Sequence, residues 1–168
     1  MPIISTSRLE LLEICETDAP FILELFNTPS WLKYIGDRNL RTEEDAKSYI
    51  INRLIPGYKL WGFGFYLTRL KENNVPIGIC GIVKRDFLEH VDIGFAFLPQ
   101  YEGKGFGYES ASAVMHYAQT TLGIKAIAGI TNSNNKSSIA LLEKLGLKFS
   151  KMILLPSETE EIMLFVNQ

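Results

Sequence analysis

Three glycines at alternate positions, Gly103, Gly105 and Gly107, separate two strongly patterned segments of the chain. The segment before them, residues 90–98, is rich in Phe, Ile and Val and predicts a strand. The segment after them predicts a long helix with one continuous apolar face, formed by Ala111, Val114, Met115, Ala118 and Leu122. Glycine lets a backbone turn sharply and approach a ligand, and a helix start offers free amides and a positive dipole end. A strand, a glycine loop and a helix in this order therefore predict a site for a phosphate or pyrophosphate.

Two common nucleotide-binding patterns do not fit this loop. A P-loop needs G-x-x-x-x-G-K-[ST], but Leu98 stands at the place of its first glycine, and Gly105 follows Lys104 where Ser or Thr is required. A dinucleotide site needs G-x-G-x-x-G and an acidic residue about 20 positions later. The loop has the spacing G-x-G-x-G, and residues 124–131 contain no acid. The remaining alternatives are an anion site of another kind and a tight strand-to-helix turn.

The rest of the chain alternates strand and helix patterns in an order that predicts an α+β fold. Before the long helix we expect a strand, a helix opened by Thr17 and Asp18 and stopped at residues 27–29, a second helix over 43–53 opened by the capping box of Thr42, and three strands. After it we expect a strand, a helix capped by Asn134 or Asn135, and two closing strands. The expected strands are residues 8–15, 61–69, 76–84, 90–98, 124–131, 147–155 and 160–167. No linker or repeat divides this order, so residues 1–168 are expected to form a single domain.

Composition argues against several kinds of partner and compartment. The 17 basic and 19 acidic residues give a net charge of −2 without a basic stripe, which argues against nucleic acid. No run approaches the roughly 18 apolar residues of a membrane span, and the start of the chain lacks a secretion signal. Cys15 and Cys80 have no partner at zinc-ligand spacing and are expected to be buried free thiols. We therefore expect a cytoplasmic protein without a metal, in which His90 and His116 are non-catalytic.

Two segments resemble the signatures of GNAT-type N-acetyltransferases. Residues 103–109 look like the coenzyme A loop, [QR]-x-x-G-x-[GA], and residues 135–147 look like the second signature, N-x-x-S followed by a short helix ending in L-G-F. Residues 6–11 and 92–95 narrow the likeness to the RimJ/RimL-like branch and extend it over essentially the whole chain. The resemblance implies a mixed, mostly antiparallel twisted sheet of about seven strands with four helices, whose splayed central strands hold the acyl-CoA. It also implies transfer of an acetyl group from acetyl-CoA to a primary amine.

The resemblance assigns roles to residues at matching positions. The expected coenzyme-binding residues are Phe97, Leu98, Glu102, Gly103, Lys104, Gly105, Phe106, Gly107, Tyr108, Asn135 and Ser138. A backbone amide near Phe97 is expected to hold the oxyanion, Asp92 to draw the amine's proton through water, and Ser138 to lie near the sulfur. Three positions depart from the family, and the smallest change is Leu147 in place of the usual Phe. Leu142 stands where many members have the Tyr that protonates the thiolate, and Glu102 puts a negative charge beside the expected pyrophosphate.

Other interpretations stay open on the sequence alone. Asp92 also fits an edge-strand carboxylate facing solvent, Ser138 an ordinary first-turn helix residue, and Lys104 a solvated loop lysine. The acceptor is either a protein N-terminus, such as that of a ribosomal protein, or a small-molecule amine, with residues 31–38 near it. A non-catalytic acyl-CoA-binding module would carry the same loop. The chain is expected to be a monomer or a homodimer.

Overall fold

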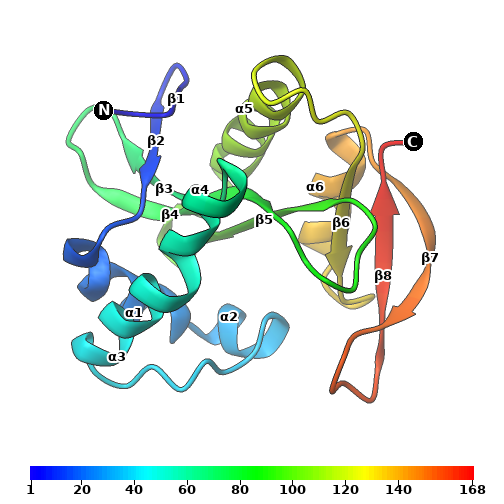
Figure 1. The fold of residues 1–168 in the computed structure, drawn as a ribbon, viewed down its shortest axis with the longest axis horizontal. Helices are drawn as coiled ribbons and strands as arrows, with labels where there is room; N and C mark the ends of the chain where they lie inside the picture. Colours follow the sequence, from blue (N-terminus) through cyan, green and yellow to red (C-terminus); the bar gives the residue numbers. More distant parts are fainter.

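One eight-stranded sheet runs through the structure, a computed structural model that describes residues 1–168. The strands lie in the order β1-β2-β3-β4-β5-β6-β8-β7 (Figure 1). Their bounds are β1 Ile4–Ser5, β2 Leu9–Glu13, β3 Phe65–Leu70, β4 Pro76–Val83, β5 Val91–Phe97, β6 Ile127–Thr131, β7 Lys148–Leu154 and β8 Glu161–Val166. Every neighbouring pair is antiparallel except β5 and β6, which run parallel. The predicted mixed, mostly antiparallel sheet is therefore confirmed.

Helices pack on both faces of this sheet. Their bounds are α1 Ala19–Phe26, α2 Pro29–Tyr34, α3 Glu43–Tyr49, α4 Ile55–Trp61, α5 Phe106–Thr120 and α6 Lys136–Lys144. One apolar core joins α1, α2 and α3 to Ile79 of β4, and a second core joins α5 and α6 to Cys80 of the same strand. Because neighbouring strand residues point to opposite faces, α1–α3 and α5–α6 lie on opposite sides of the sheet. No helix of the chain combines the length and hydropathy that a bilayer crossing requires.

The helices exceed the sequence prediction in two places, both beside a proline. Pro29 follows the first helix and opens α2, because proline suits the first turn of a helix. The second predicted helix continues past residue 53, and Pro56 lies in the first turn of α4. Here α3, a π-helical turn at Ile50–Leu54 and α4 form one run that ends at Gly62, whose φ is +80°. Counted as one, this run gives five helices instead of four, and the short β1 adds an eighth strand.

The two cysteines differ in burial. Cys80 is fully buried in β4, and burial raises its thiol pKa to about 12. Cys15 is exposed, so the expectation of a buried thiol is wrong for this residue. It lies beyond the end of β2, where the chain leaves the sheet for a 3-10 turn at Glu16–Asp18, and its sulfur lies 3.0 Å from the Thr17 hydroxyl.

A charged cluster, which we call the N-terminal clamp (Thr6, Arg8 and Glu109), ties the N-terminal segment to the start of α5. The Glu109 carboxylate accepts hydrogen bonds from Arg8 Nε at 2.7 Å, the Arg8 amide at 3.0 Å and the Thr6 hydroxyl at 2.7 Å. The Arg8 guanidinium also donates to the Lys104 carbonyl at 3.2 Å and lies 4.3 Å from the centre of the Phe106 ring. Burial raises the pKa of Glu109, but the hydrogen bonds from Thr6 and Arg8 outweigh it and hold the pKa below its ordinary value of 4.5. The clamp thus fixes the loop that precedes α5.

Replacing Glu109 by Gln should lower the free energy of unfolding at pH 7 by about 1–2 kcal/mol, because the charged hydrogen bonds from Arg8 are lost. A carboxyl whose pKa is lowered by folding stabilises the protein above its unfolded pKa and loses that contribution as the pH falls through its folded pKa. The difference between wild type and Glu109→Gln should therefore shrink below about pH 4.5. Urea unfolding at a series of pH values measures it. The control is Glu72→Gln, at an exposed position in the β3–β4 turn; an equal loss in both variants would contradict the clamp.

Candidate active site

The strands β5 and β6 pair over two residues and then separate. Val91 pairs with Ile127 and Asp92 with Ala128, and no later residue of β5 pairs with β6. Beyond this point β5 stays with β4 as far as Phe97, whereas β6 stays with β8. We call this divergence the β5/β6 fork, with Asp92 at its closed end. The predicted splay of the central strands is confirmed.

The backbone of Phe97 faces the fork. The amide of Leu98 donates to the carbonyl of Ile77 in β4 at 2.9 Å, which fixes the orientation of the end of β5. Successive residues of an extended strand direct their N–H and C=O groups to opposite sides. The Phe97 groups therefore point away from β4 and toward β6, which has moved off. A strand edge without a neighbouring strand offers hydrogen-bonding groups to an extended ligand.

The glycine loop ends in an uncapped helix start. Gly103 has a φ of +73° and Gly105 a φ of +84°, both in the region that favours glycine. Gly105 is the N-cap of α5, and no side chain caps this end of the helix. The amides of the first turn, beginning at Phe106 and Gly107, therefore have no partner within the helix. Together with the dipole of a 15-residue helix they form a site for an anion.

The side chains around this helix start carry charge of both signs. Glu102 and Lys104 are exposed, and the Lys104 ammonium lies 5.8 Å from the centre of the Tyr101 ring. Tyr108 is partly exposed, with the Lys144 ammonium of α6 4.2 Å from its ring centre. Lys104 and Lys144 thus bring positive charge to the same end of α5 at which Glu102 brings a negative one.

The start of α6 lies at the open end of the fork. It follows β6 as the glycine loop follows β5, and the carboxyl ends of parallel strands share one edge of a sheet. Asn135, rather than Asn134, caps the helix, because its side-chain oxygen accepts a hydrogen bond from the Ser138 amide at 3.3 Å. A terminal carbon of Leu141 lies 3.2 Å from the place where a Cβ on Gly107 would be. The candidate coenzyme residues on β5, α5 and α6 therefore come together at one edge.

The segment at residues 31–38 also reaches this edge. Asn132, which directly follows β6, donates a hydrogen bond to the carbonyl of Tyr34 at 3.0 Å. Next to it, Leu32 and Ile35 are 41% and 42% exposed. This segment therefore lies beside one arm of the fork, on the sheet face that α1–α3 cover.

Asp92 is a buried carboxylate at the closed end of the fork, 2% exposed. Its Oδ2 accepts a hydrogen bond from Arg85 Nε at 2.7 Å, whereas its Oδ1 is buried without a partner. Burial raises the pKa of Asp92 to about 6, against the opposing effect of the Arg85 guanidinium. The interpretation of Asp92 as an edge-strand carboxylate facing solvent is wrong, because β5 is an interior strand with β4 on one side and β6 on the other.

Asp92 and Ser138 do not meet. Asp92 pairs with Ala128, three residues before β6 ends at Thr131, and a strand rises about 3.3 Å per residue, so this part of the chain alone separates them by about 10 Å. Leu142 is buried and packs against Gly129, so the position of the family's Tyr holds no proton donor. No three His, Cys, Asp or Glu side chains gather where they could hold a metal ion.

Sequence reasoning missed the partners of the charged site residues. Arg85 precedes Asp92 by seven residues, in an irregular segment whose path no periodicity predicts. The pairing of Arg8 with Glu109 joins residues 101 positions apart, so no local pattern contains both. The sequence did hold a signal for the start of the coenzyme loop. Gln100 fills the first position of the pattern [QR]-x-x-G-x-[GA], so the motif begins three residues before Gly103.

Comparisons with known proteins agree with this geometry. The chain is 29% identical over 147 residues to an uncharacterized N-acetyltransferase, YoaA of Bacillus subtilis (strain 168), across 86% of this chain and 82% of that protein. It is similar to the crystal structure of an acetyltransferase from Agrobacterium tumefaciens str. C58, with a TM-score of 0.82 and 21% identity over 99% of this chain and 94% of that one. RimL, a ribosomal L7/L12 alpha-N-protein acetyltransferase in complex with coenzyme A, gives a TM-score of 0.81 at 18% identity, over 99% and 97% of the two chains. Residues 8–148 match the acetyltransferase (GNAT) domain, so the chain belongs to this family and is an acetyl-CoA-dependent N-acetyltransferase.

Proposed function

We propose that this enzyme acetylates a primary amine at the β5/β6 fork, as a member of the RimJ/RimL-like branch. The observation that carries the proposal is the position of Asp92, a buried carboxylate at the closed end of a fork whose open end carries an anion site. A thioester held along the fork would have the phosphates of its coenzyme at one end and a proton acceptor at the other.

Acetyl-CoA lies along the fork in this proposal. The pyrophosphate binds the free amides at the start of α5. The loop and first turn around it are formed by Glu102, Gly103, Lys104, Gly105, Phe106, Gly107 and Tyr108. The pantetheine arm pairs with the free edge of β5 at Phe97, as an added strand would. Leu98 contributes by holding that edge in orientation through its bond to Ile77, and Asn135 and Ser138 border the arm from α6.

The reaction forms one C–N bond and breaks one C–S bond. The nitrogen of the neutral amine attacks the thioester carbonyl carbon, and the carbonyl oxygen becomes an oxyanion to which the Phe97 amide donates. Collapse of the tetrahedral intermediate expels the thiolate of coenzyme A, to which the Ser138 hydroxyl donates a hydrogen bond. The proton that leaves the amine passes through water to Asp92. The products are an amide and, once the thiolate has taken up a proton, the free thiol.

The surroundings of Asp92 suit a general base. A carboxyl with a pKa of about 6 is mostly ionised at pH 7 and is more basic than an exposed aspartate. Arg85 occupies Oδ2 only, so the buried Oδ1 is left for a bridging water. Because Phe97 lies five residues further along β5, about 16 Å from Asp92 along the strand, the amine's proton would pass along a chain of waters that begins at this oxygen.

The acceptor class is tested by thiol release from acetyl-CoA with a panel of N-terminal peptides and small amines. A protein N-terminus is supported by the likeness to RimL, which acts on such a group. A small-molecule amine is supported by a hollow whose floor includes Ala128, the register partner of Asp92. If acetyl-CoA raises the melting temperature but no amine causes thiol release, the chain is an acyl-CoA-binding module and the proposed function is wrong.

Gly103→Ala should raise the Kd for acetyl-CoA about tenfold. An added Cβ at positive φ costs about 1–2 kcal/mol, and relief of that strain moves the loop. Gly123→Ala is the matched control: its φ is +70° against +73° at Gly103, and neither added Cβ would meet an atom within 4 Å. Both variants should lose similar stability in urea, and isothermal titration should find weaker binding only for Gly103→Ala. Equal affinities in the two variants would show that the loop does not bind the coenzyme.

Asp92→Asn should lower kcat/KM by about 10²–10⁴-fold, because the amine's proton loses its acceptor. The wild-type rate should rise with pH as Asp92 loses its proton near pH 6, and this acidic limb should be absent from the variant. Rates measured from pH 5 to 9 with saturating acetyl-CoA test both statements. Asp86→Asn, at an exposed position in the same loop, should keep the wild-type profile. Full turnover by Asp92→Asn would show that Asp92 does not accept the amine's proton.

A further inference from the structure

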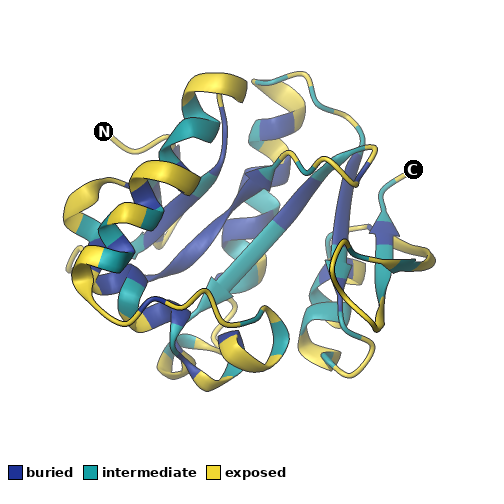
Figure 2. Cartoon of the chain, turned by 60° about the horizontal axis from the view of Figure 1, so that its bottom comes forward, coloured by how far each residue is buried: buried dark blue, intermediate teal, exposed yellow.

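Half of one sheet face carries no helix. α1–α3 pack over β3 and β4 on this face, whereas over β6, β8 and β7 it presents Ala128, Val166, Leu164 and Ile153. Their register puts them on one side, because Ala128 pairs with Val166 and the others follow at alternate positions. The opposite side of β8 carries Phe165, which is buried in the core with α5 and α6. The β7–β8 hairpin is correspondingly exposed (Figure 2).

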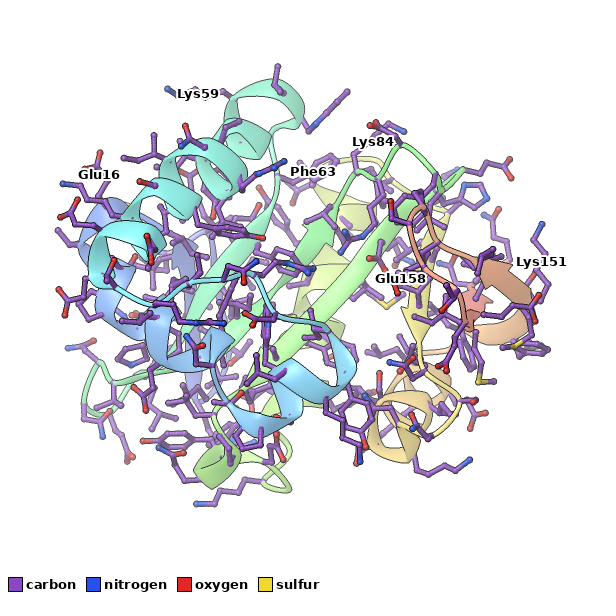
Figure 3. All side chains as sticks on the ribbon, turned by 90° about the horizontal axis from the view of Figure 1, so that it is seen from below. Glu16, Lys59, Phe63, Lys84, Lys151 and Glu158 are labelled. Atoms are coloured by element: carbon purple, nitrogen blue, oxygen red, sulfur yellow. The ribbon has the colours of Figure 1, made fainter.

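The segment at residues 84–90, which joins β4 to β5, lies over this open face and leaves a hollow of about 530 Å³. Figure 3 labels Lys84 at the start of this segment and Lys151 and Glu158 on the facing hairpin. Seven of the 11 residues that line the hollow are hydrophobic. Two of them, Phe87 and Leu154, are 41% and 59% exposed, so a ligand in the hollow would remove apolar surface from water. A volume of this size falls in the range of roughly 300–1,000 Å³ that small-molecule sites occupy.

The hollow begins one strand away from Asp92. Its floor includes Ala128, the register partner of Asp92 across the parallel pair. Paired residues of neighbouring strands point to the same face and lie about 4.8 Å apart. The segment that roofs the hollow also supplies Arg85, which holds one oxygen of Asp92 and leaves the buried Oδ1 without a partner. A buried carboxylate with one oxygen free of hydrogen bonds therefore lies one strand beyond the apolar floor.

The charges at the rim select against a polycation. The polar lining residues are Glu89, His90, Ser150 and Lys151, so one carboxylate is balanced by one ammonium. A ligand with several ammonium groups would need several carboxylates, and the hollow offers no such surplus. A single amine attached to an apolar body matches both the lining and the lone free oxygen of Asp92.

We propose that this hollow, between residues 84–90 and the exposed face of β6, β8 and β7, binds the apolar body of a small-molecule primary amine that is the acetyl acceptor. The amine nitrogen lies toward Asp92, and the aromatic or branched aliphatic body covers Phe87, Leu154 and Leu164. A volume of about 530 Å³ fits a small molecule rather than an extended peptide. The inference rests on the proposed acetyl transfer and adds the class of acceptor.

The first experiment compares amines on the wild-type enzyme with acetyl-CoA. Values of kcat/KM for 2-phenylethylamine and isoamylamine should exceed that for ethylamine at least tenfold, because only the larger bodies fill the apolar hollow. Spermidine and a tetrapeptide beginning with Ser should react more slowly than 2-phenylethylamine. Preference for either of these two would overturn the inference while leaving acetyl transfer to amines intact.

The second experiment places a charge in the hollow. Leu154→Asp and Phe87→Asp, both at exposed positions, should raise the KM for 2-phenylethylamine at least tenfold and leave the KM for acetyl-CoA unchanged. The matched control is Leu60→Asp, at a 71% exposed leucine of α4 outside the hollow, which should behave as wild type. An unchanged KM in both hollow variants would overturn the inference.

Direct binding separates this inference from the proposed reaction. If no amine is acetylated, the proposed function fails, but titration of 2-phenylethylamine into the acetyl-CoA-loaded protein still reports on the hollow. Binding that Leu154→Asp abolishes and Leu60→Asp retains would support the site, and no binding would overturn it. Analytical ultracentrifugation tests whether a second copy of the chain occupies the hollow instead. A wild-type dimer that Leu154→Asp dissociates would make the hollow a subunit interface and overturn the inference.

Discussion

The candidate residues of this site take their positions from the loss of pairing between β5 and β6 after Asp92 and Ala128. Unpaired backbone groups inside a sheet are costly, so such a fork persists only if each strand is held elsewhere. β5 keeps its register with β4 from Asp92 to Phe97, and β6 keeps its register with β8 from Ala128 onward. Each arm is thus anchored on its outer side. The inner edges remain free for a ligand that pairs as a strand does.

The two helices behind the fork turn this opening into a place for an anionic coenzyme. Both α5 and α6 begin at the same sheet edge, and they contact each other where Gly107 has no side chain to keep Leu141 away. The start of α5 is held from the far edge of the sheet by the N-terminal clamp, because Arg8 bonds both to Glu109 and to the Lys104 carbonyl. The ion pair with Arg8 also offsets the negative charge of Glu109, which lies beside an anion site. Without that pairing, a carboxylate in the first turn would repel the phosphates that the free amides attract.

The sequence predicts the parts of this structure that depend on local patterns. The strand, glycine loop and amphipathic helix at residues 90–122 lie as expected, since periodicity and glycine content are properties of neighbouring residues. The burial of Asp92 was not predictable, because one aspartate in an apolar strand suits an edge and an interior position equally well. The same holds for Cys15, whose exposure follows from the path of the chain beyond β2. Arg85 and Arg8 find their partners through the tertiary fold, so neither pairing leaves a signal in a short window of sequence.

The segment at residues 84–90 joins two properties that are usually considered separately, the basicity of the proton acceptor and the shape of the space beside it. Burial alone would raise the pKa of Asp92 further, whereas a second cation would lower the pKa and make the carboxylate a weaker base. The charge of a partly exposed Arg85 and its hydrogen bond are the largest effects that oppose burial. Because the same seven-residue segment carries Phe87 over the apolar face, any change in its path moves the guanidinium and the roof of the hollow together. Selection for a different acceptor would therefore act on this segment under the constraint that Arg85 stays within reach of Asp92.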